Sequence, residues 1–180
     1  MKLIFFSDIH GSEYYTKKAI ETFEKEQGDM MILLGDLLYH GPRNDLPKEY
    51  APKKVLELLN GYKKKIIAVR GNCDSEVDQM VLEFPIMAEY NTIVYGERKI
   101  FATHGHIWNE AKIPMLNDKD ILIHGHTHLP VAKEQDNIFI LNPGSISLPK
   151  ENNVPSYGVI ENNAFSIKSF EGDIIKNIKL

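Results

Sequence analysis

The sequence predicts a single α/β domain spanning residues 1–180, in which two mixed β-sheets face each other with helices outside, an αββα sandwich. Two observations lead to this prediction. In the first half, short apolar runs alternate with segments of helical periodicity, as in strand–helix–strand units with a largely parallel sheet. In the second half, after Phe84-Pro85, apolar runs follow one another with turn residues between them, which is typical of β-hairpins.

The first half contains three predicted strands and two predicted helices. The first helix covers Tyr14–Gln27, where Ala19, Ile20 and Phe23 fall on one side of a charged segment. The second begins at Pro52, because proline is tolerated in a first helical turn, and continues through a leucine-rich run. The strands are predicted at Lys2–Ser7, Met30–Leu34 and Ile66–Val69.

The second half contains six further strand-like runs separated by turn signals such as Asp136-Asn137. They cover Thr92–Tyr95, Ile100–Thr103, Ile121–His124, Phe139–Leu141, Tyr157–Ile160 and Phe165–Phe170. The stretch "DILIHGHTHLPV" places His124, His126 and His128 at the end of one run. Alternate residues of a strand share one face, so these three histidines are predicted to lie on the same side.

Composition excludes several classes of protein. A hydrophobic content of 43% and a charged content of 26% are typical of a soluble domain, and no segment reaches the roughly 18 apolar residues of a membrane span. The net charge of −4 and the absence of a long basic run argue against general binding to nucleic acid or membranes. The single cysteine and the lack of a signal-peptide pattern predict a cytoplasmic protein. Apolar residues between Trp108 and Met115 are candidates for a homo-oligomer contact.

Residues able to bind metals follow the predicted strands. Strands of a parallel sheet bring their carboxyl ends to one edge, where α/β proteins build sites. Carboxylate, amide and imidazole donors together suit Mn, Fe, Zn, Co or Ni better than Ca or Mg. The residues in question are Asp8, His10, Asp36, Asn72, His104, His126 and His128.

The motifs "DIHG", "GD", "GNCD", "THGH" and "GHTH", in this order, resemble the calcineurin-like metallophosphoesterase superfamily. The longer segments "LGDLLYHGPRNDLP", "VRGNCDSEVDQM" and "NPGSISLPK" resemble its small bacterial phosphodiesterases, and the resemblance covers nearly the whole chain. It implies that Asp36 bridges two metal ions. The first ion would be held by Asp8, His10 and His128, and the second by Asn72, His104 and His126.

The implied cofactors are two divalent ions, with Mn²⁺ as our first choice and Zn²⁺, Fe²⁺, Co²⁺ or Ni²⁺ as alternatives. The implied reaction is hydrolysis of a small phosphodiester by a metal-bound hydroxide, which two ions can activate and orient. With a hydroxide and two aspartates, two divalent ions leave an inner charge of about +1, which matches a diester monoanion.

One position departs from the superfamily pattern. Most members have histidine where this chain has Cys73, and that histidine is the one usually assigned to protonate the leaving oxygen. Cys73 and Asp74 are candidate catalytic residues. Because a thiol is a weaker acid than imidazolium, Cys73 favours substrates with good leaving groups. The alternative role of Cys73 is simple packing. The candidate substrate-binding residues are Arg43, Arg70 and His40.

Other functions stay open at this point. A phosphomonoesterase uses the same chemistry but gains from additional cationic groups around a dianion. A non-catalytic scaffold is a second alternative, because the superfamily includes trafficking-complex subunits that have lost ligand histidines; all seven ligand positions are filled here. A nuclease would need a basic or aromatic groove, for which the acidic composition offers no support. His106 and His124 either shape the site or pack.

Overall fold

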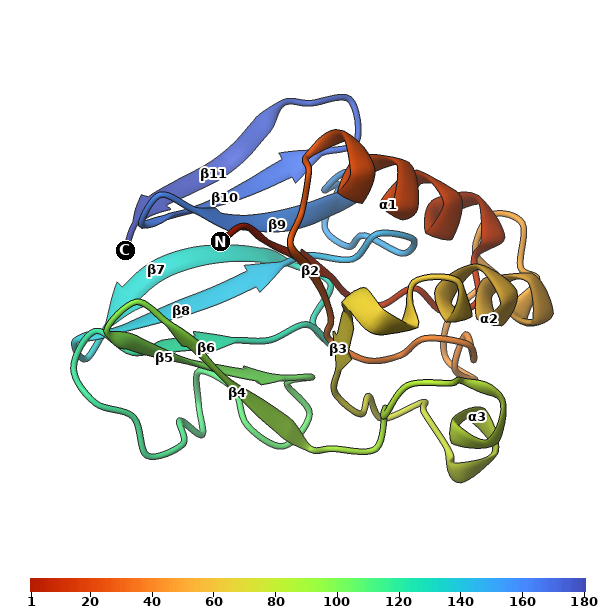
Figure 1. The fold of residues 1–180 in the computed structure, drawn as a ribbon, viewed down its shortest axis with the longest axis horizontal. Coiled ribbons are helices and arrows are strands. Elements are labelled where there is room, and N and C mark those ends of the chain that lie inside the picture. The colour runs from red at the N-terminus through yellow and green to blue at the C-terminus, as the bar shows by residue number, and fades with distance from the viewer.

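The computed structural model describes residues 1–180 as two β-sheets and three α-helices (Figure 1). The helices are α1 (Glu13–Lys25), α2 (Pro52–Asn60) and α3 (Glu76–Val81), with a short 3₁₀-helix, η1 (Lys63–Lys65). The six-stranded sheet contains, in spatial order, β11 (Ile174–Lys179), β10 (Ala164–Ser169), β9 (Ser156–Glu161), β1 (Leu3–Phe6), β2 (Met30–Leu33) and β3 (Ile66–Ala68). The five-stranded sheet contains β4 (Tyr90–Tyr95), β5 (Arg98–Thr103), β6 (Ile121–Ile123), β8 (Ile138–Pro143) and β7 (Pro130–Gln135).

Both sheets combine parallel and antiparallel pairs. β1, β2 and β3 pair in parallel, as the alternation of strands and helices predicts, whereas β9, β10 and β11 add antiparallel hairpins. In the other sheet β5, β6 and β8 are parallel, a feature that the hairpin signals of the second half do not reveal. The parallel strands of both sheets therefore bring several carboxyl ends to one region of the molecule.

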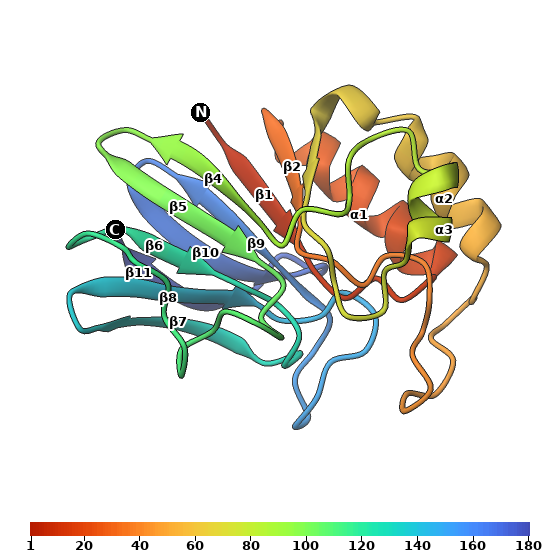
Figure 2. The ribbon, with the colours of Figure 1, turned by 90° about the horizontal axis from the view of Figure 1, so that it is seen from below.

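Two apolar layers hold the sandwich together. Alternate residues of β1 point to opposite faces, so Phe6 packs toward α1 and α2, while Phe5 lies between the sheets against Phe165, with ring centroids 6.4 Å apart. Burial on both faces explains why β1 and β2 are continuous apolar runs. Figure 2 shows the two sheets face to face and the helices grouped beside β1 and β2.

A loop, rather than a helix, covers the outer face of the five-stranded sheet. Trp108, Ile113 and Leu116 pack there on a cluster that includes Phe101 and Leu122. The predicted fold class, two facing mixed sheets with helices outside, is confirmed, and the helices lie on the six-stranded side. Met115, in the same loop, is 96% exposed, and the homo-oligomer contact stays a prediction.

The predicted helices agree closely with the structure. α1 begins at Glu13, where the Ser12 hydroxyl accepts a hydrogen bond from the amide of Tyr15, and α2 begins at Pro52. Three elements, α3, β7 and β11, were not predicted, because they carry few or no buried apolar side chains and so show weak periodicity. None of the helices is both long and apolar enough to cross a membrane, and the cytoplasmic location stays a prediction.

Candidate metal centre

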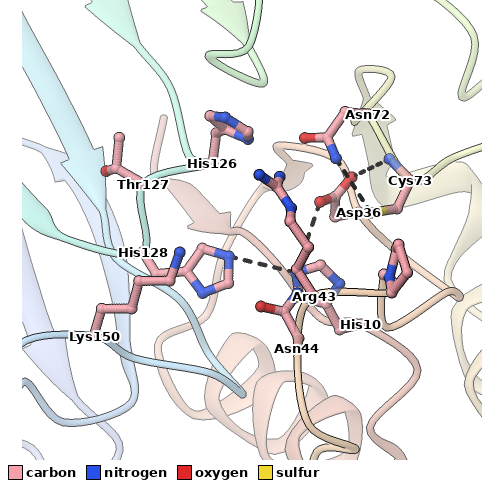
Figure 3. A pocket seen from close by; sticks show the side chains of 12 residues that line it. His10, Asp36, Arg43, Asn44, Asn72, Cys73, His126, Thr127, His128 and Lys150 are labelled. Atoms are coloured by element: carbon pink, nitrogen blue, oxygen red, sulfur yellow. Dashed lines mark hydrogen bonds and ion pairs between the residues drawn. The ribbon is translucent and has the colours of Figure 1, made fainter.

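The seven predicted ligands gather where loops from the two sheets meet. Asp8 and His10 follow β1, Asp36 follows β2 and Asn72 follows β3, while the remaining histidines follow β5 and β6. Five of the seven line a cavity of about 400 Å³, shown in Figure 3. Asp8 and His104 are completely buried beside it. The packing of two sheets thus joins ligands that are as far apart in the sequence as Asp8 and His128.

Asp8, His10 and His128 form the first cluster of ligand atoms. The Nε2 atoms of His10 and His128 are 3.4 Å apart, and Oδ1 of Asp8 lies 3.3 Å from His128 Nε2 and 3.8 Å from His10 Nε2. These three ligand atoms lie within 4.8 Å of one another. One ion placed among them would be reached by all three.

Asn72, His104 and His126 form the second cluster. Nε2 of His104 lies 3.0 Å from Oδ1 of Asn72 and 3.2 Å from Nδ1 of His126. Asp36 lies between the two clusters, because its Oδ2 is 3.7 Å from His10 Nε2 and 3.5 Å from His104 Nε2. This is the position that a bridging carboxylate would occupy.

Backbone carbonyls fix the tautomers of three histidines. Nδ1 of His10 donates to the carbonyl of Tyr39 at 2.9 Å, Nδ1 of His104 to Leu34 at 2.7 Å, and Nδ1 of His128 to Leu148 at 2.5 Å. Because a carbonyl only accepts, each neutral ring carries its proton on Nδ1 and directs the free Nε2 electron pair at its cluster. This arrangement matches that of histidines prepared to bind a metal.

An unpartnered buried oxygen supports the same assignment. Oδ1 of Asp8 is buried and has no hydrogen-bond partner, although a buried carboxylate oxygen without a partner is strongly unfavourable. Two Nε2 electron pairs 3.4 Å apart also repel unless a cation or proton lies between them. The donor set of this centre therefore fits divalent ions.

The ligands perturb one another's ionisation. Burial raises the pKa of Asp8, but the neighbouring His128 ring and the charge of His104 outweigh it and hold that pKa well below its ordinary value. Burial disfavours the cationic form of His104, yet its interactions with Asp36 and Asp8 raise its pKa to about 9. Burial and the neighbouring His104 lower the pKa of His126 to about 4. In the metal-free protein, a proton on His104 thus takes the place of a cation beside Asp36.

Comparison with known proteins identifies the family. Residues 1–164 match the calcineurin-like phosphoesterase superfamily domain. The chain belongs to this superfamily. It is 51% identical over 167 residues to the phosphodiesterase YfcE of Escherichia coli strain K12, covering 93% of this chain and 91% of that protein. The predicted family and its classification as a hydrolase acting on phosphoric esters are confirmed.

Solved structures agree with this membership. A structure described as YfcE, a phosphoesterase from E. coli, superimposes with a TM-score of 0.98 and 48% identity, covering 99% of both chains. Vacuolar protein sorting 29 from Cryptosporidium parvum superimposes with a TM-score of 0.64 at 17% identity, covering 99% of this chain and 98% of that chain. At that identity the likeness shows the shared fold alone.

Backbone geometry is unusual at this superfamily site. Five of the seven candidate ligands have a positive backbone φ angle, which residues other than glycine rarely adopt because of steric conflict. Such residues cluster at functional sites, where the surrounding structure holds them. The φ angles are 57° for Asp8, 49° for His10, 56° for Asp36, 66° for His126 and 61° for His128.

The same geometry corrects one prediction. β6 ends at Ile123, so His124, His126 and His128 do not share one face of a strand. Positive φ at His126 and His128 turns the chain and breaks the two-residue alternation, so that these two rings join different clusters. His124 joins neither cluster: it is buried, its Nδ1 lies 3.1 Å from the carbonyl oxygen of Gly125, and its Nε2 has no partner.

Cys73 and Asp74 have different surroundings. Cys73 is half-buried and lines the cavity, and its backbone amide donates to Oδ1 of Asp36 at 2.8 Å. Burial and the charge of Asp36 raise the pKa of its thiol to about 12. Asp74 does not line the cavity; its buried carboxylate accepts hydrogen bonds from the backbone amides of Asp36, Leu37 and Gly71. Asp74 therefore joins the loops that follow β2 and β3.

Of the three candidate substrate-binding residues, one lines the main cavity and two do not. Arg43 lines the main cavity, whereas Arg70 and His106 line a second cavity of about 310 Å³ that also contacts Asn72. His40 lines neither of these cavities: its ring packs against Tyr39 and Tyr50, with centroids 4.8 and 5.2 Å away.

Five residues that line the cavity were not predicted from the sequence: Gly41, Pro42, Asn44, Thr127 and Lys150. A signal for Lys150 was present, because it ends the segment "NPGSISLPK". That segment supports the ligands directly: the hydroxyls of Ser145 and Ser147 donate to the Asp8 carbonyl at 3.0 and 2.8 Å. The segment that holds Asp8 in this way also fixes the backbone position of Lys150 at its end.

Proposed function

We propose that this protein is a metal-dependent phosphodiesterase that hydrolyses small phosphodiesters at a centre of two divalent ions, with Mn²⁺ as the first choice. The observation that supports this most is the position of Asp36 between the two clusters, with its Oδ2 facing Nε2 of His10 in one and Nε2 of His104 in the other. The name of the E. coli relative supports the choice of diesters. With two ions bound, the inner charge of about +1 suits a diester monoanion.

The metal ions would supply Lewis-acid stabilisation of the phosphoryl oxygens and lower the pKa of a coordinated water. The residues of the chain hold and orient this centre. Asp8, His10 and His128 would bind one ion, and Asn72, His104 and His126 the other, with Asp36 shared. In the neutral rings of His10, His104 and His128, the Nδ1 bonds to backbone carbonyls leave Nε2 free to bind an ion.

The remaining candidates act around these ligands. Cys73 is on the cavity wall and, as a protonated thiol, is the group that could give a proton to a leaving oxygen. Asp74 acts as a positioning residue, because it binds the amides of Asp36 and Leu37. Arg43 contacts the substrate, while Arg70 and His40 lie outside the main cavity.

Metal removal and reconstitution test this proposal. Purified protein is treated with chelator, and metal content is measured together with hydrolysis of bis(4-nitrophenyl) phosphate. We expect the depleted protein to be inactive and Mn²⁺ to restore activity as occupancy approaches about two ions per chain. Full activity after verified depletion would contradict the proposal, and saturation at a single ion would contradict the dinuclear centre.

A phosphomonoesterase is a second candidate, favoured by one observation. Two cationic side chains, Arg43 and Lys150, line the cavity, and a monoester dianion would gain from both. Hydrolysis of 4-nitrophenyl phosphate, compared with the diester at equal metal occupancy, decides between the two. A larger kcat/KM for the monoester would favour this candidate.

A further inference from the structure

The cavity of the metal centre carries two positive charges that no carboxylate neutralises. Arg43 and Lys150 both line it, and neither side chain lies within ion-pair distance of an aspartate or glutamate, unlike Arg70, whose guanidinium lies 3.9 Å from Glu76. The one acidic side chain in the cavity wall is Asp36, which faces the metal ligands. The outer part of the cavity is therefore cationic independently of any bound metal.

Lys150 is held in place by a metal-ligand residue. The His128 ring donates to the Leu148 carbonyl at 2.5 Å, and the Lys150 amide donates to the His128 carbonyl at 3.5 Å. The Lys150 carbonyl in turn accepts the side-chain amide of Asn153 at 2.8 Å. The backbone of this lysine thus has a fixed position relative to the first ligand cluster, although its side chain is exposed.

Arg43 enters from a different loop, the one between β2 and α2. The turn that carries it is closed by bonds from Asn44 to the carbonyls of Gly41, at 3.3 Å, and His40, at 2.8 Å. Gly41 lies so close to Cys73 that a Cβ atom there would be 3.1 Å from its sulfur. Figure 3 shows the Arg43 and Lys150 side chains coming to the cavity from separate loops.

The two cations lie closer to the protein surface than most of the candidate metal ligands. The ligand atoms of Asp8, His10 and His104 are buried, whereas Arg43 and Lys150 are exposed at the rim. A phosphoryl group bound at the buried ligands would leave much of the 400 Å³ cavity for the rest of the substrate. The cations are thus placed to meet a part of the substrate other than the phosphorus under attack.

We infer that Arg43 and Lys150 bind a second anionic group, such as a phosphate, on an ester arm of the substrate. The inference rests on the proposed function and refines it: the preferred substrates are small phosphodiesters with an additional negative charge. Hydrogen bonds between charged partners at a partly exposed rim predict a preference of about 10-fold or more for the charged substrate at low salt.

A matched pair of substrates tests the inference. Thymidine 5′-(4-nitrophenyl phosphate) and its 3′-phosphorylated form share the scissile bond and the leaving group and differ by one phosphate. For Mn²⁺-loaded protein, we expect the ratio of kcat/KM values, charged over uncharged arm, to fall about 10-fold or more in Lys150→Ala and in Arg43→Ala. Lys64→Ala, an exposed lysine of η1 outside the cavity, serves as the control and should keep the wild-type ratio.

Binding without turnover gives an independent readout. Calorimetry with thymidine 3′,5′-bisphosphate and thymidine 5′-monophosphate should show a preference for the bisphosphate that Lys150→Ala loses and Lys64→Ala keeps. If metal-loaded wild type hydrolyses neither diester, the proposed function fails, while selective bisphosphate binding would still support the anion site. Equal losses for both ligands would place Lys150 on the reacting phosphate and overturn the inference, as would the absence of any preference in the wild type.

Discussion

Asp36 is the residue that lies between the two clusters of candidate ligands. Its Oδ2 faces His10 and His104, while its Oδ1 accepts the Cys73 amide and its own amide binds Asp74. A carboxylate in this position would both reduce the repulsion between two cations and set their separation.

Asp36→Asn tests this role. The amide removes a negative charge while keeping the shape, so we expect kcat to fall at least as far as in His10→Asn, about 100-fold or more, with fewer ions bound. Metal analysis and kinetics are measured on the same samples. Asp118→Asn, an exposed aspartate, is the control. Near-normal kcat and metal content in Asp36→Asn would remove this residue from the centre.

Cys73 is the residue where the chain departs from its superfamily. Its thiol pKa, raised to about 12 by burial and by Asp36, makes it a protonated but very weak acid at neutral pH. A poor acid slows the departure of basic leaving groups far more than that of nitrophenolate.

Cys73→His should therefore accelerate an alkyl diester more than a nitrophenyl diester, with a gain of about 100-fold for the alkyl leaving group. The comparison uses kcat/KM for matched diesters, with Cys73→Ser as the control that keeps a weak donor. Metal content is measured in each variant, since an imidazole could itself bind an ion. Equal changes for both leaving groups at unchanged metal content would leave Cys73 with a packing role.

At the scale of elements, the loop after β6 leaves no space for a side chain larger than glycine at position 125. Gly125 lies against the loop after β1, and a Cβ atom there would be 1.8 Å from Ser7 Oγ and 2.8 Å from Asp8 Oδ2. The Gly125 amide also donates to the His104 carbonyl at 2.8 Å. This glycine permits the close approach of loops that carry ligands from both sheets.

Gly125→Ala should consequently lower the free energy of unfolding by about 3 kcal/mol and weaken metal binding, because the new methyl group must displace the side chains of Ser7 and Asp8. Urea unfolding and metal titration measure the two effects. Gly96→Ala is a matched control: no atom lies within 4 Å of its added Cβ, and its φ of 61° predicts a loss of only about 1 kcal/mol. Equal small losses in both variants would contradict the close-approach argument.

At the scale of the whole molecule, metal and protons compete for the same buried site. The pKa of His104 is raised from 6.5 to about 9, so the stabilisation from its protonation in the metal-free fold is complete below pH 6.5 and is lost as pH rises through 9. Metal binding requires the unprotonated ring and strengthens over the same range.

The difference in Tm between Mn²⁺-loaded and chelated protein should thus increase from pH 6.5 to pH 9. Thermal unfolding across this window, with and without chelator, measures it. His104→Gln removes the titrating group and should flatten the dependence, whereas His106→Gln, an exposed histidine, should leave it in place. A pH-independent difference in the wild type would contradict the competition.

The sequence by itself predicted the family, the two-sheet architecture and the seven residues that the structure brings together. These features depend on local signals: apolar runs ending in Asp, Asn or His, helical periodicity after Tyr14, proline at the start of the second helix, and short motifs carried within single loops. Such signals can be read from the sequence alone, because each depends on residues that are neighbours in the chain. The same reasoning failed at His124 and missed β7, β11 and α3, whose local patterns are weak.

Only the tertiary structure decided how the motifs are arranged around the cavity. Contacts between loops distant in sequence place Asp36 between the two clusters and let Asp74 connect the loops after β2 and β3. They also place Arg70 at a second cavity and bring Lys150 to the same cavity as Arg43. The sequence lacks this information, because positive φ at five ligands and the facing of two sheets are imposed by packing across the whole domain rather than by adjacent residues.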